Sequence, residues 1–346
     1  MSQPLRIGLI ISGESSFPAA LLEEVNGRDA GVVAELVRVG TPRMSDAVPY
    51  AVIIDRASHE VPFYRTYLKH AALHGCHVVN NPFVWSADDK FFGATVAAQL
   101  GIASPRTVLL PHKEYVPGMV HETALRNLEY PLDWQGVIDH VGLPCILKDA
   151  HGGGWRDVHL CHSLEELLFH YNESGQLLMI AQEYIQWDRF FRCLCLGREA
   201  VLPMEYDPRG RCYLAEEAPL EPGLRERMVG DSLRLVRALG YDMNAIEWAV
   251  RHGVPYAIDL MNPAPDMDVS SLPERHFTWT VKHMADLAVR LARETRPAQP
   301  DPASRWAGAM TGGRLTGGSD LDGAGDLAEE LPSLARDLPR AREDDS

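Results

Sequence analysis

Short apolar runs alternate with helical patterns over the first 82 residues. The runs lie at 7–11, 51–54 and 77–79, and helical periodicity covers 17–25 and 64–74. Continuous apolar strands separated by helices are typical of a parallel sheet that is covered on both faces. We therefore expect a small α/β unit over residues 1–82. Its turn at 13–16 either contacts a ligand at the carboxyl end of a strand or only connects a strand to a helix.

Helices and strand pairs follow between residues 83 and 294. The predicted helices cover 90–100, 133–141, 163–171, 222–239 and 277–294. Predicted strands lie near 107–110, 144–148, 158–160, 179–181, 192–196, 200–206, 244–250 and 255–262. From residue 295 onward Pro, Gly, Ala, Ser and Asp dominate without periodicity, which predicts a disordered tail over 295–346 with room for a short interaction helix.

Composition and charge exclude several classes of protein. The 346 residues are 46% hydrophobic and 23% charged, with a net charge of −15, as expected for a globular chain. This acidic balance argues against nonspecific binding to nucleic acid or an anionic membrane. There is no signal-peptide pattern or long apolar span, so we expect a cytoplasmic protein. Its six cysteines lack C-x-x-C spacing and are expected to be reduced, mostly buried thiols.

The stretch from Pro144 to Trp155 carries the strongest chemical signal. An apolar strand ends in Lys148, and Gly152, Gly153 and Gly154 then form a turn before a second strand begins near Val158. A Walker loop would open a helix and end in Gly-Lys-Ser/Thr, and a dinucleotide fingerprint would also lead into a helix. The hairpin is therefore either an ordinary tight turn or a mobile cover over a polyphosphate, with backbone N–H groups as anion donors.

Other polar residues lie at strand and helix ends. Lys90 occupies the first turn of a helix capped by Ser86–Asp89, where a cation gains nothing from the helix dipole, so a phosphate contact is an alternative to simple solvation. The Gln182–Glu183 pair follows a strand, with Asp188 shortly after. Arg192 lies on a strand, where it either forms a structural ion pair or reaches into a cleft.

Two carboxylates are expected on neighbouring strands near the end of the fold. Alternation places Glu247 on one face of strand 244–250 and Asp259 on one face of strand 255–262, which ends at Asn262. Facing carboxylates are unfavourable unless a cation lies between them, and oxygen ligands of this kind suit Mg²⁺. The alternative is that each acid faces solvent, which the apolar setting of both strands makes less favourable.

In this order, these features resemble the ATP-grasp superfamily, in particular its glutathione synthetase-like carboxylate–amine ligases. The resemblance covers residues 83–294 and implies a two-lobed ATP-grasp domain with a lid lobe near 105–185. It also implies that residues 1–82 form the Rossmann-like α/β domain that usually precedes it. No single motif is specific, and the ordered set carries the resemblance.

The resemblance implies a role for each of these residues. Lys90 and Lys148 would contact the phosphates of ATP, beneath a lid formed by Gly152–Gly154. Gln182, Glu183 and Ile185 would hold the adenine, and Asp188 the ribose. The arginine of the family's R-x-x-x-x-G strand corresponds to Arg192, which with Lys148 would be catalytic by steadying the transferring phosphate. The metal ligands for Mg²⁺ or Mn²⁺ would be Glu247, Asp259 and Asn262.

One spacing departs from the family pattern. Relatives usually close the metal site with Glu-x-Asn, whereas this chain has Asp259-Leu-Met-Asn262. Three-residue spacing places the two side chains on opposite faces of a strand unless a bulge intervenes. Either a bulge restores the geometry before Pro263, or Asp266 or Asp268 takes the place of one ligand.

The function that the resemblance implies is an ATP-dependent ligase that joins a small-molecule carboxylate to an amine, or to a thiol, through an acyl phosphate. A small-molecule kinase on the same fold and a noncatalytic nucleotide-binding module are the alternatives. The acidic balance argues mildly against a kinase for anionic acceptors. The sequence does not identify the substrates, and a homodimer is left open.

Overall fold

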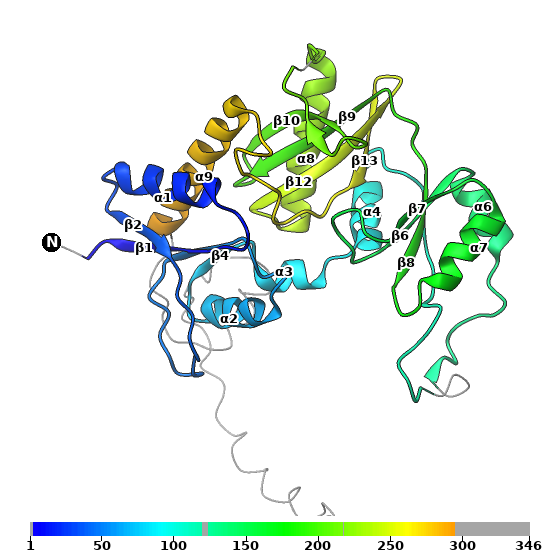
Figure 1. Ribbon diagram of the computed structural model, residues 1–346, viewed down its shortest axis with the longest axis horizontal. Coiled ribbons are helices and arrows are strands. Elements are labelled where there is room, and N and C mark those ends of the chain that lie inside the picture. Colours follow the sequence, from blue (N-terminus) through cyan, green and yellow to red (C-terminus); the bar gives the residue numbers. More distant parts are fainter. Residues whose placement is uncertain (1–2, 120–123, 217, 295–346) are drawn as a thin grey trace, which may run out of the picture. The chain divides into compact units, whose positions relative to one another are not determined.

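The computed structural model describes residues 3–119, 124–216 and 218–294. Within these ranges the strands form three sheets, which we call the N-terminal, small and large sheets (Figure 1). The predicted disordered tail over 295–346 lies outside the described residues. The α/β fold class is confirmed, with a parallel sheet followed by two antiparallel sheets.

The N-terminal sheet is parallel and has the strand order β2-β1-β3-β4. Its strands are β1 (Leu5–Ile10), β2 (Val32–Leu36), β3 (Val52–Asp55) and β4 (His77–Val79), and its helices are α1 (Ser16–Gly27) and α2 (Pro62–Leu73). The sequence prediction missed β2. Four of the five positions of this strand are only partly buried. Glu35 interrupts its apolar run, so the sequence pattern for a buried strand is weak here.

The small sheet has the order β5-β8-β6-β7, and every pair in it is antiparallel. Its strands are β5 (Thr107–Leu109), β6 (Cys145–Asp149), β7 (Val158–Cys161) and β8 (Met179–Glu183). Helices α6 (Trp134–Val141) and α7 (Leu164–Glu173) lie beside this sheet (Figure 1). Side chains from both helices pack with Leu147 and Ala181 in one buried cluster, so the helices cover that face of the sheet.

The large sheet has the order β11-β10-β9-β12-β13, again antiparallel throughout. It consists of β9 (Arg189–Leu196), β10 (Ala200–Asp207), β11 (Cys212–Tyr213), β12 (Met243–Arg251) and β13 (Val254–Asp259). Helices α4 (Lys90–Gln99) and α8 (Pro222–Leu239) contribute to the cluster beneath one face, and the short α3 (Pro82–Ala87) precedes α4. Gly240 ends α8 in the left-handed conformation, as its position after the helical pattern predicts.

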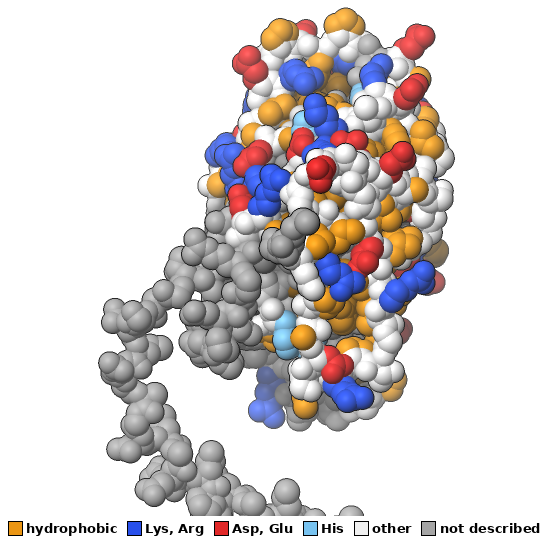
Figure 2. Space-filling model, turned by 90° about the vertical axis from the view of Figure 1, so that its left-hand side faces the viewer, with side chains coloured by type: hydrophobic (Ala, Val, Ile, Leu, Met, Phe, Trp, Pro, Cys, Tyr) orange, Lys and Arg blue, Asp and Glu red, His pale blue; other side chains and the backbone are white. Residues whose placement is uncertain are grey.

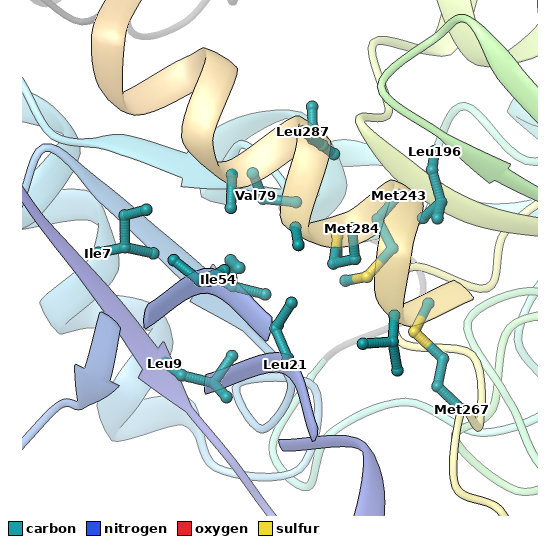
Figure 3. Packing of buried hydrophobic residues seen from close by; sticks show 14 of the residues in the cluster. Ile7, Leu9, Leu21, Ile54, Val79, Leu196, Met243, Met267, Met284 and Leu287 are labelled. Atoms are coloured by element: carbon teal, nitrogen blue, oxygen red, sulfur yellow. The ribbon is translucent and has the colours of Figure 1, made fainter. Parts of the chain in front are cut away.

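An apolar cluster joins the N-terminal sheet to one end of the large sheet. Helix α9 (Glu274–Glu294) supplies Met284 and Leu287, the N-terminal sheet supplies Leu9 and Ile54, and Met243 comes from β12 (Figure 3). Because α9 buries side chains against both sheets, it holds the start of β12 next to the carboxyl ends of the parallel strands.

Several local predictions are confirmed. Ser163 caps α7 by accepting a hydrogen bond from the Glu166 amide at 3.2 Å, and Asp89 caps α4 by accepting one from the Phe92 amide at 2.7 Å. Five of the six free cysteines are buried, and Cys212 is exposed.

None of the helices in the described part of the chain combines the length and the hydrophobicity that spanning a bilayer requires. Positive and negative side chains are interspersed on the face drawn in Figure 2. The cytoplasmic location and the homodimer stay predictions.

Candidate active site

Three charged residues meet on one face of the large sheet. In the strand register Glu247 on β12 lies opposite Arg192 on β9 and opposite Asp259 on β13. Their neighbours Cys193, Ile246 and Trp248 pack against α8, so alternation places Arg192 and Glu247 on the opposite face. The Nε and Nη2 atoms of Arg192 both donate to Oε1 of Glu247, at 2.9 and 2.6 Å.

A β-bulge determines where Asp259 lies. Trp248 pairs with Ala257 and Glu247 pairs with Asp259, so Ile258 is an extra residue on β13. The bulge thus comes before Asp259, whereas a bulge between Asp259 and Asn262 would be needed to bring these two side chains to one face of the strand. Past the end of β13, the Asn262 amide donates to the Asn244 side chain at 2.8 Å and the Asn262 carbonyl accepts from the Ala245 amide. Asn262 therefore stays beside β12.

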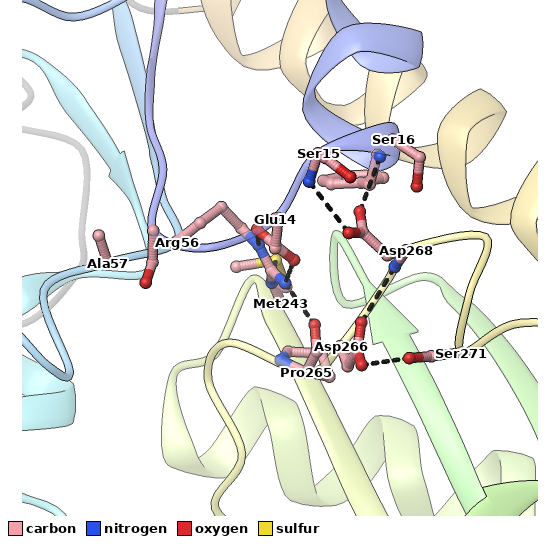
Figure 4. A network of polar contacts seen from close by, with 12 residues as sticks. Glu14, Ser15, Ser16, Arg56, Ala57, Met243, Pro265, Asp266, Asp268 and Ser271 are labelled. Carbon is pink, nitrogen blue, oxygen red and sulfur yellow. Dashed lines mark hydrogen bonds and ion pairs between the residues drawn. The ribbon is translucent and has the colours of Figure 1, made fainter.

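The alternative ligands Asp266 and Asp268 are bonded elsewhere. Asp268 accepts hydrogen bonds from the amides of Ser15 and Phe17 at the start of α1, at 3.0 and 2.9 Å. The carboxylate of Asp266 accepts from the Ser271 hydroxyl and the Asp268 amide (Figure 4). The Asp268 contacts tie the loop after β13 to the N-terminal unit, and the Asp266 contacts hold the loop itself together.

Two lysines from separate elements reach the end of β13, at Ile258 and Asp259. Lys148 lies on the face of the small sheet that α6 and α7 leave uncovered, and its Nζ donates to the carbonyl of Ile258 at 3.0 Å. Lys90, in the first turn of α4, places Nζ 3.3 Å from Oδ2 of Asp259 and 2.8 Å from the carbonyl of Gly152. The small sheet, the large sheet and α4 therefore converge at this point.

Burial makes the electrostatics of this group strong. The side chains of Lys90 and Glu247 are 8% and 15% exposed. Burial lowers the pKa of Lys148, against the opposing effect of Asp259. Burial raises the pKa of Glu247, against the effect of Arg192. Burial alone would raise the pKa of Asp259, but Lys90 and Lys148 outweigh it and hold that pKa below its ordinary value. With all five groups ionised, three cations face two carboxylates, so the group keeps one excess positive charge.

The glycine hairpin forms a loop between β6 and β7. The Lys90 amide donates to the Ala150 carbonyl, so α4 and the base of the loop are joined. Gly154 has a φ of +66°, and Trp155 and Asp157 have φ values of 62° and 53°. A bulky residue with positive φ is uncommon and occurs where surrounding contacts or function require it.

The predicted adenine residues divide between the two faces of β8. Gln182 shares a face with Lys148, and its Nε2 donates to the Thr107 hydroxyl at 3.1 Å. Glu183 points to the other side, where its carboxylate lies 3.0 Å from Arg106 and 3.7 Å from Arg251. This ion pair joins the small sheet to the end of β12, a role that the sequence does not indicate.

The remaining two predicted residues, Ile185 and Asp188, lie just after the end of β8. Ile185 is 3% exposed and packs in an aromatic cluster with Phe190 and Tyr206. Asp188 is 59% exposed and accepts from the His252 amide at 2.7 Å, so its carboxylate supports the β12–β13 turn. The structure thus brings Ile185 near the Arg192 strand, whereas the carboxylate of Asp188 is held at the turn.

The sequence reading missed three aromatic residues at this site. The ring centre of Tyr206 lies 3.8 Å from the guanidinium of Arg192, and Tyr213 pairs with Tyr206 across β10 and β11. The Tyr241 hydroxyl donates to the carboxylate of Asp88 at 2.5 Å, and Asp88 is a buried residue two positions before Lys90. On β10, Tyr206 lies two positions after Met204, which pairs with Arg192, so both side chains are on the same face. The sequence could have indicated Tyr206 only if this strand register had been known.

The oxygen donors fit a hard divalent cation. Magnesium is commonly held by one or two carboxylates, with phosphates and water completing its octahedron. Glu247 and Asp259 supply two carboxylates, with Asn262 beside the same strand. In the part of the chain described, no three His, Cys, Asp or Glu residues cluster as a metal cage.

Comparisons with known proteins identify the fold. No family model matches the chain. Human mitochondrial pyruvate carboxylase is 29% identical over 138 residues, and the rat enzyme is 31% identical. Each match covers 34% of this chain and 12% of the carboxylase, so the chain spans only a small part of these relatives.

Solved structures match over most of the chain. The VanG D-Ala:D-Ser ligase from Enterococcus faecalis has a TM-score of 0.60 at 13% identity, covering 84% of this chain and 100% of that one. A RimK domain ATP-grasp protein from Sphaerobacter thermophilus has a TM-score of 0.59 at 16% identity, covering 83% and 98%. The D-alanine–D-alanine ligase from Bacillus anthracis, complexed with ATP, has a TM-score of 0.52 at 15% identity, covering 85% and 99%. The chain has the ATP-grasp fold.

Proposed function

We propose that this protein is an ATP-dependent ligase that joins a small-molecule carboxylate to an amine, releasing ADP and phosphate. The observation that carries the proposal is the convergence of Lys90, Lys148 and Arg192 with the carboxylates of Glu247 and Asp259. The ATP-grasp fold supports it, because the ATP-grasp structures that match include ligases.

The residues are assigned by charge and position. Lys90 and Lys148 would bind the phosphates of ATP, and both are buried cations that already contact β13 or its acid. Glu247, Asp259 and Asn262 would hold Mg²⁺, which when bound supplies charge neutralisation for the phosphates. The lid at Gly152–Gly154 would exclude water. The hinge around Gln182–Ile185 would hold adenine, through Gln182 and backbone groups more than through the Glu183 carboxylate.

Arg192 has the position of a transition-state residue. Its guanidinium is fixed on a strand, so it can steady negative charge on the transferring phosphoryl group without reorganisation. In the first step a substrate carboxylate oxygen bonds to the γ-phosphorus and the bond to ADP breaks. In the second step the amine bonds to the acyl carbon, phosphate leaves and the amine loses a proton. Positioning and charge provide the catalysis, so a side-chain nucleophile is not required.

The test is an ADP-release assay of the purified chain with Mg-ATP and a panel that pairs small carboxylates with amines. We expect ADP release that needs both partners. ADP release with a hydroxyl acceptor alone would point to a kinase. Tight ATP binding without turnover across the panel would point to a noncatalytic nucleotide-binding module.

Lys148→Met tests the site while keeping the fold. In this variant Asp259 keeps Lys90 and Glu247 keeps Arg192, so no buried carboxylate loses its last cation and we expect the chain to fold. We expect kcat/KM for ATP to fall by at least about 100-fold. Lys282→Ala on the exposed side of α9 is the matched control and should retain full activity. Equal activity of Lys148→Met and the native chain would contradict the assignment.

A further inference from the structure

Two tyrosines enclose Arg192 on the sides that Glu247 does not occupy. The guanidinium carbon lies 3.8 Å from the ring centre of Tyr206. Tyr213 lies within electrostatic reach of the same guanidinium, because burial raises the pKa of Tyr213 and the charge of Arg192 opposes that rise. The rings of Tyr206 and Tyr213 are 5.1 Å apart and nearly perpendicular. The side chain of Arg192 is only 16% exposed, so its position is largely determined by these three neighbours.

The large sheet fixes both rings before any ligand arrives. Tyr206 lies near the end of β10 and is 6% exposed, packed with Phe190 and Ala249. Tyr213 is its direct partner on β11. Burial raises the pKa of Tyr213 to about 12, so its hydroxyl stays protonated at neutral pH and can accept from a guanidinium N–H.

Glu247 has two competing roles if the proposed function holds. One oxygen, Oε1, accepts both Arg192 hydrogen bonds, and the same carboxylate would bind Mg²⁺. A divalent cation withdraws charge from that carboxylate and weakens its hold on Arg192. Contacts from a neutral ring and a neutral hydroxyl are unaffected by this competition, because neither depends on the charge of Glu247.

We propose that Tyr206 and Tyr213 are positioning residues that keep Arg192 in place when Glu247 binds a metal ion. This inference rests on the proposed function for its catalytic consequence. Tyr206 contributes through the face of its ring, and Tyr213 through its hydroxyl.

Three variants separate these contributions. Tyr206→Leu removes the ring, and we expect kcat for ADP release to fall roughly tenfold, with KM for ATP changed less than about twofold. KM for ATP should change little, because Arg192 is proposed to stabilise the phosphoryl group during its transfer and not the bound ATP. Tyr206→Phe keeps the ring and should restore kcat. Tyr213→Phe removes the hydroxyl with little change in volume and should lower kcat by a smaller factor, about threefold.

A spectroscopic readout tests positioning without turnover. In the ¹⁵N-labelled protein, the Nε–H resonance of Arg192, identified by its loss in Arg192→Lys, should be displaced upfield by the Tyr206 ring and exchange slowly with water. The displacement should persist on adding Mg-ADP and in Tyr206→Phe. It should vanish in Tyr206→Leu. In Tyr213→Phe the displacement should remain but exchange should quicken.

A matched control accounts for general loss of packing. Tyr50 is also a buried tyrosine beneath an arginine, Arg6 at 4.9 Å, and lies beside the N-terminal sheet. Tyr50→Leu should leave both kcat and the Arg192 resonance unchanged. An unaltered Arg192 resonance in Tyr206→Leu would overturn the proposal, as would unaltered kcat. If the native chain shows no acceptor-dependent ADP release, the proposed function fails, and the resonance alone decides whether the tyrosines position Arg192.

Discussion

At the scale of single residues, burial of Asp88 is the most unusual feature near the candidate site. The residue is 7% exposed, one carboxylate oxygen accepts from Tyr241, and the other has no hydrogen-bond partner. Burial raises the pKa of Asp88 to about 6. Asp88 immediately precedes the helix cap Asp89 and then Lys90, so its protonation is linked to the segment that positions a predicted phosphate ligand.

This raised pKa gives a pH-dependent stability. Between about pH 4 and pH 6 the folded chain keeps the Asp88 proton that the unfolded chain has lost, so the free energy of unfolding falls as pH rises. Relative to Asp88→Asn, the native chain should lose up to roughly 3 kcal/mol across this interval and no more above it. Urea unfolding of both proteins from pH 3.5 to about 8 measures the difference. A difference that is constant with pH would contradict the assignment.

At the scale of elements, helix α1 begins without a side-chain cap of its own. The carboxylate of Asp268, more than 250 positions along the chain, takes the amides of Ser15 and Phe17 instead. Burial alone would raise the pKa of Asp268, but these amides outweigh it and hold that pKa below its ordinary value. The helix start therefore depends on the loop after β13.

Removing this cap should destabilise the protein by about 1–2 kcal/mol at pH 7. Asp268→Ala removes the acceptor, whereas Asp268→Asn keeps one oxygen and should cost less. Because the carboxylate must be ionised, the native chain should lose this advantage over Asp268→Ala as pH falls below about 4. Denaturant unfolding at pH 7 and pH 3.5 gives both numbers, and equal stability of the native chain and Asp268→Ala would refute the capping role.

At the scale of the whole molecule, Arg56 joins the N-terminal unit to the strand that carries Glu247. Its side chain is 1% exposed and contacts the Glu14 carboxylate, the Pro265 carbonyl and the sulfur of Met243 (Figure 4). Asn80 adds hydrogen bonds to the carbonyls of Met243 and Pro263. These contacts fix the start of β12 and the loop after β13, between which Glu247 and Asp259 lie.

Arg56→Ala should destabilise the protein by about 2–4 kcal/mol, because it leaves Glu14, whose side chain is only 14% exposed, without its cation. The double variant Glu14→Ala with Arg56→Ala should recover part of that loss, since no unpaired charge remains. Calorimetric or denaturant unfolding of the two single variants and the double variant gives the coupling free energy. Strict additivity of the single effects would show that the pair is not coupled.

Sequence reasoning was most successful where a pattern is local. The helix 222–239 with Gly240 as its end, the Ser163 cap and the glycine hairpin after Lys148 all depend on neighbours in the chain. The order of Lys90, Lys148, Arg192, Glu247 and Asp259 also indicated the ATP-grasp fold. The binding and catalytic roles of these residues stay predictions, although the structure brings all five together.

Three features of the site could be identified only from the tertiary structure. They are the bulge at Ile258, the ion pairs of Glu183 and the contacts of Asp266 and Asp268. Periodicity gives the face of a strand on which a side chain lies, but it does not give the partner opposite it. The bulge at Ile258 is defined only by the β12–β13 register, and Arg106 and Arg251 reach Glu183 from distant segments. Likewise, the free amides at the start of α1 attract Asp268 only once the chain has folded.

The sequence by itself therefore determined the elements, their order and the residue types available for chemistry, because hydrophobic period and capping act over a few residues. Only the tertiary structure decided which charges neutralise one another, as in the pairing of Arg192 with Glu247 across 55 positions. The physical reason is that hydrogen-bonded register between strands and burial in a shared core set these distances, and both arise from contacts between segments far apart in the chain.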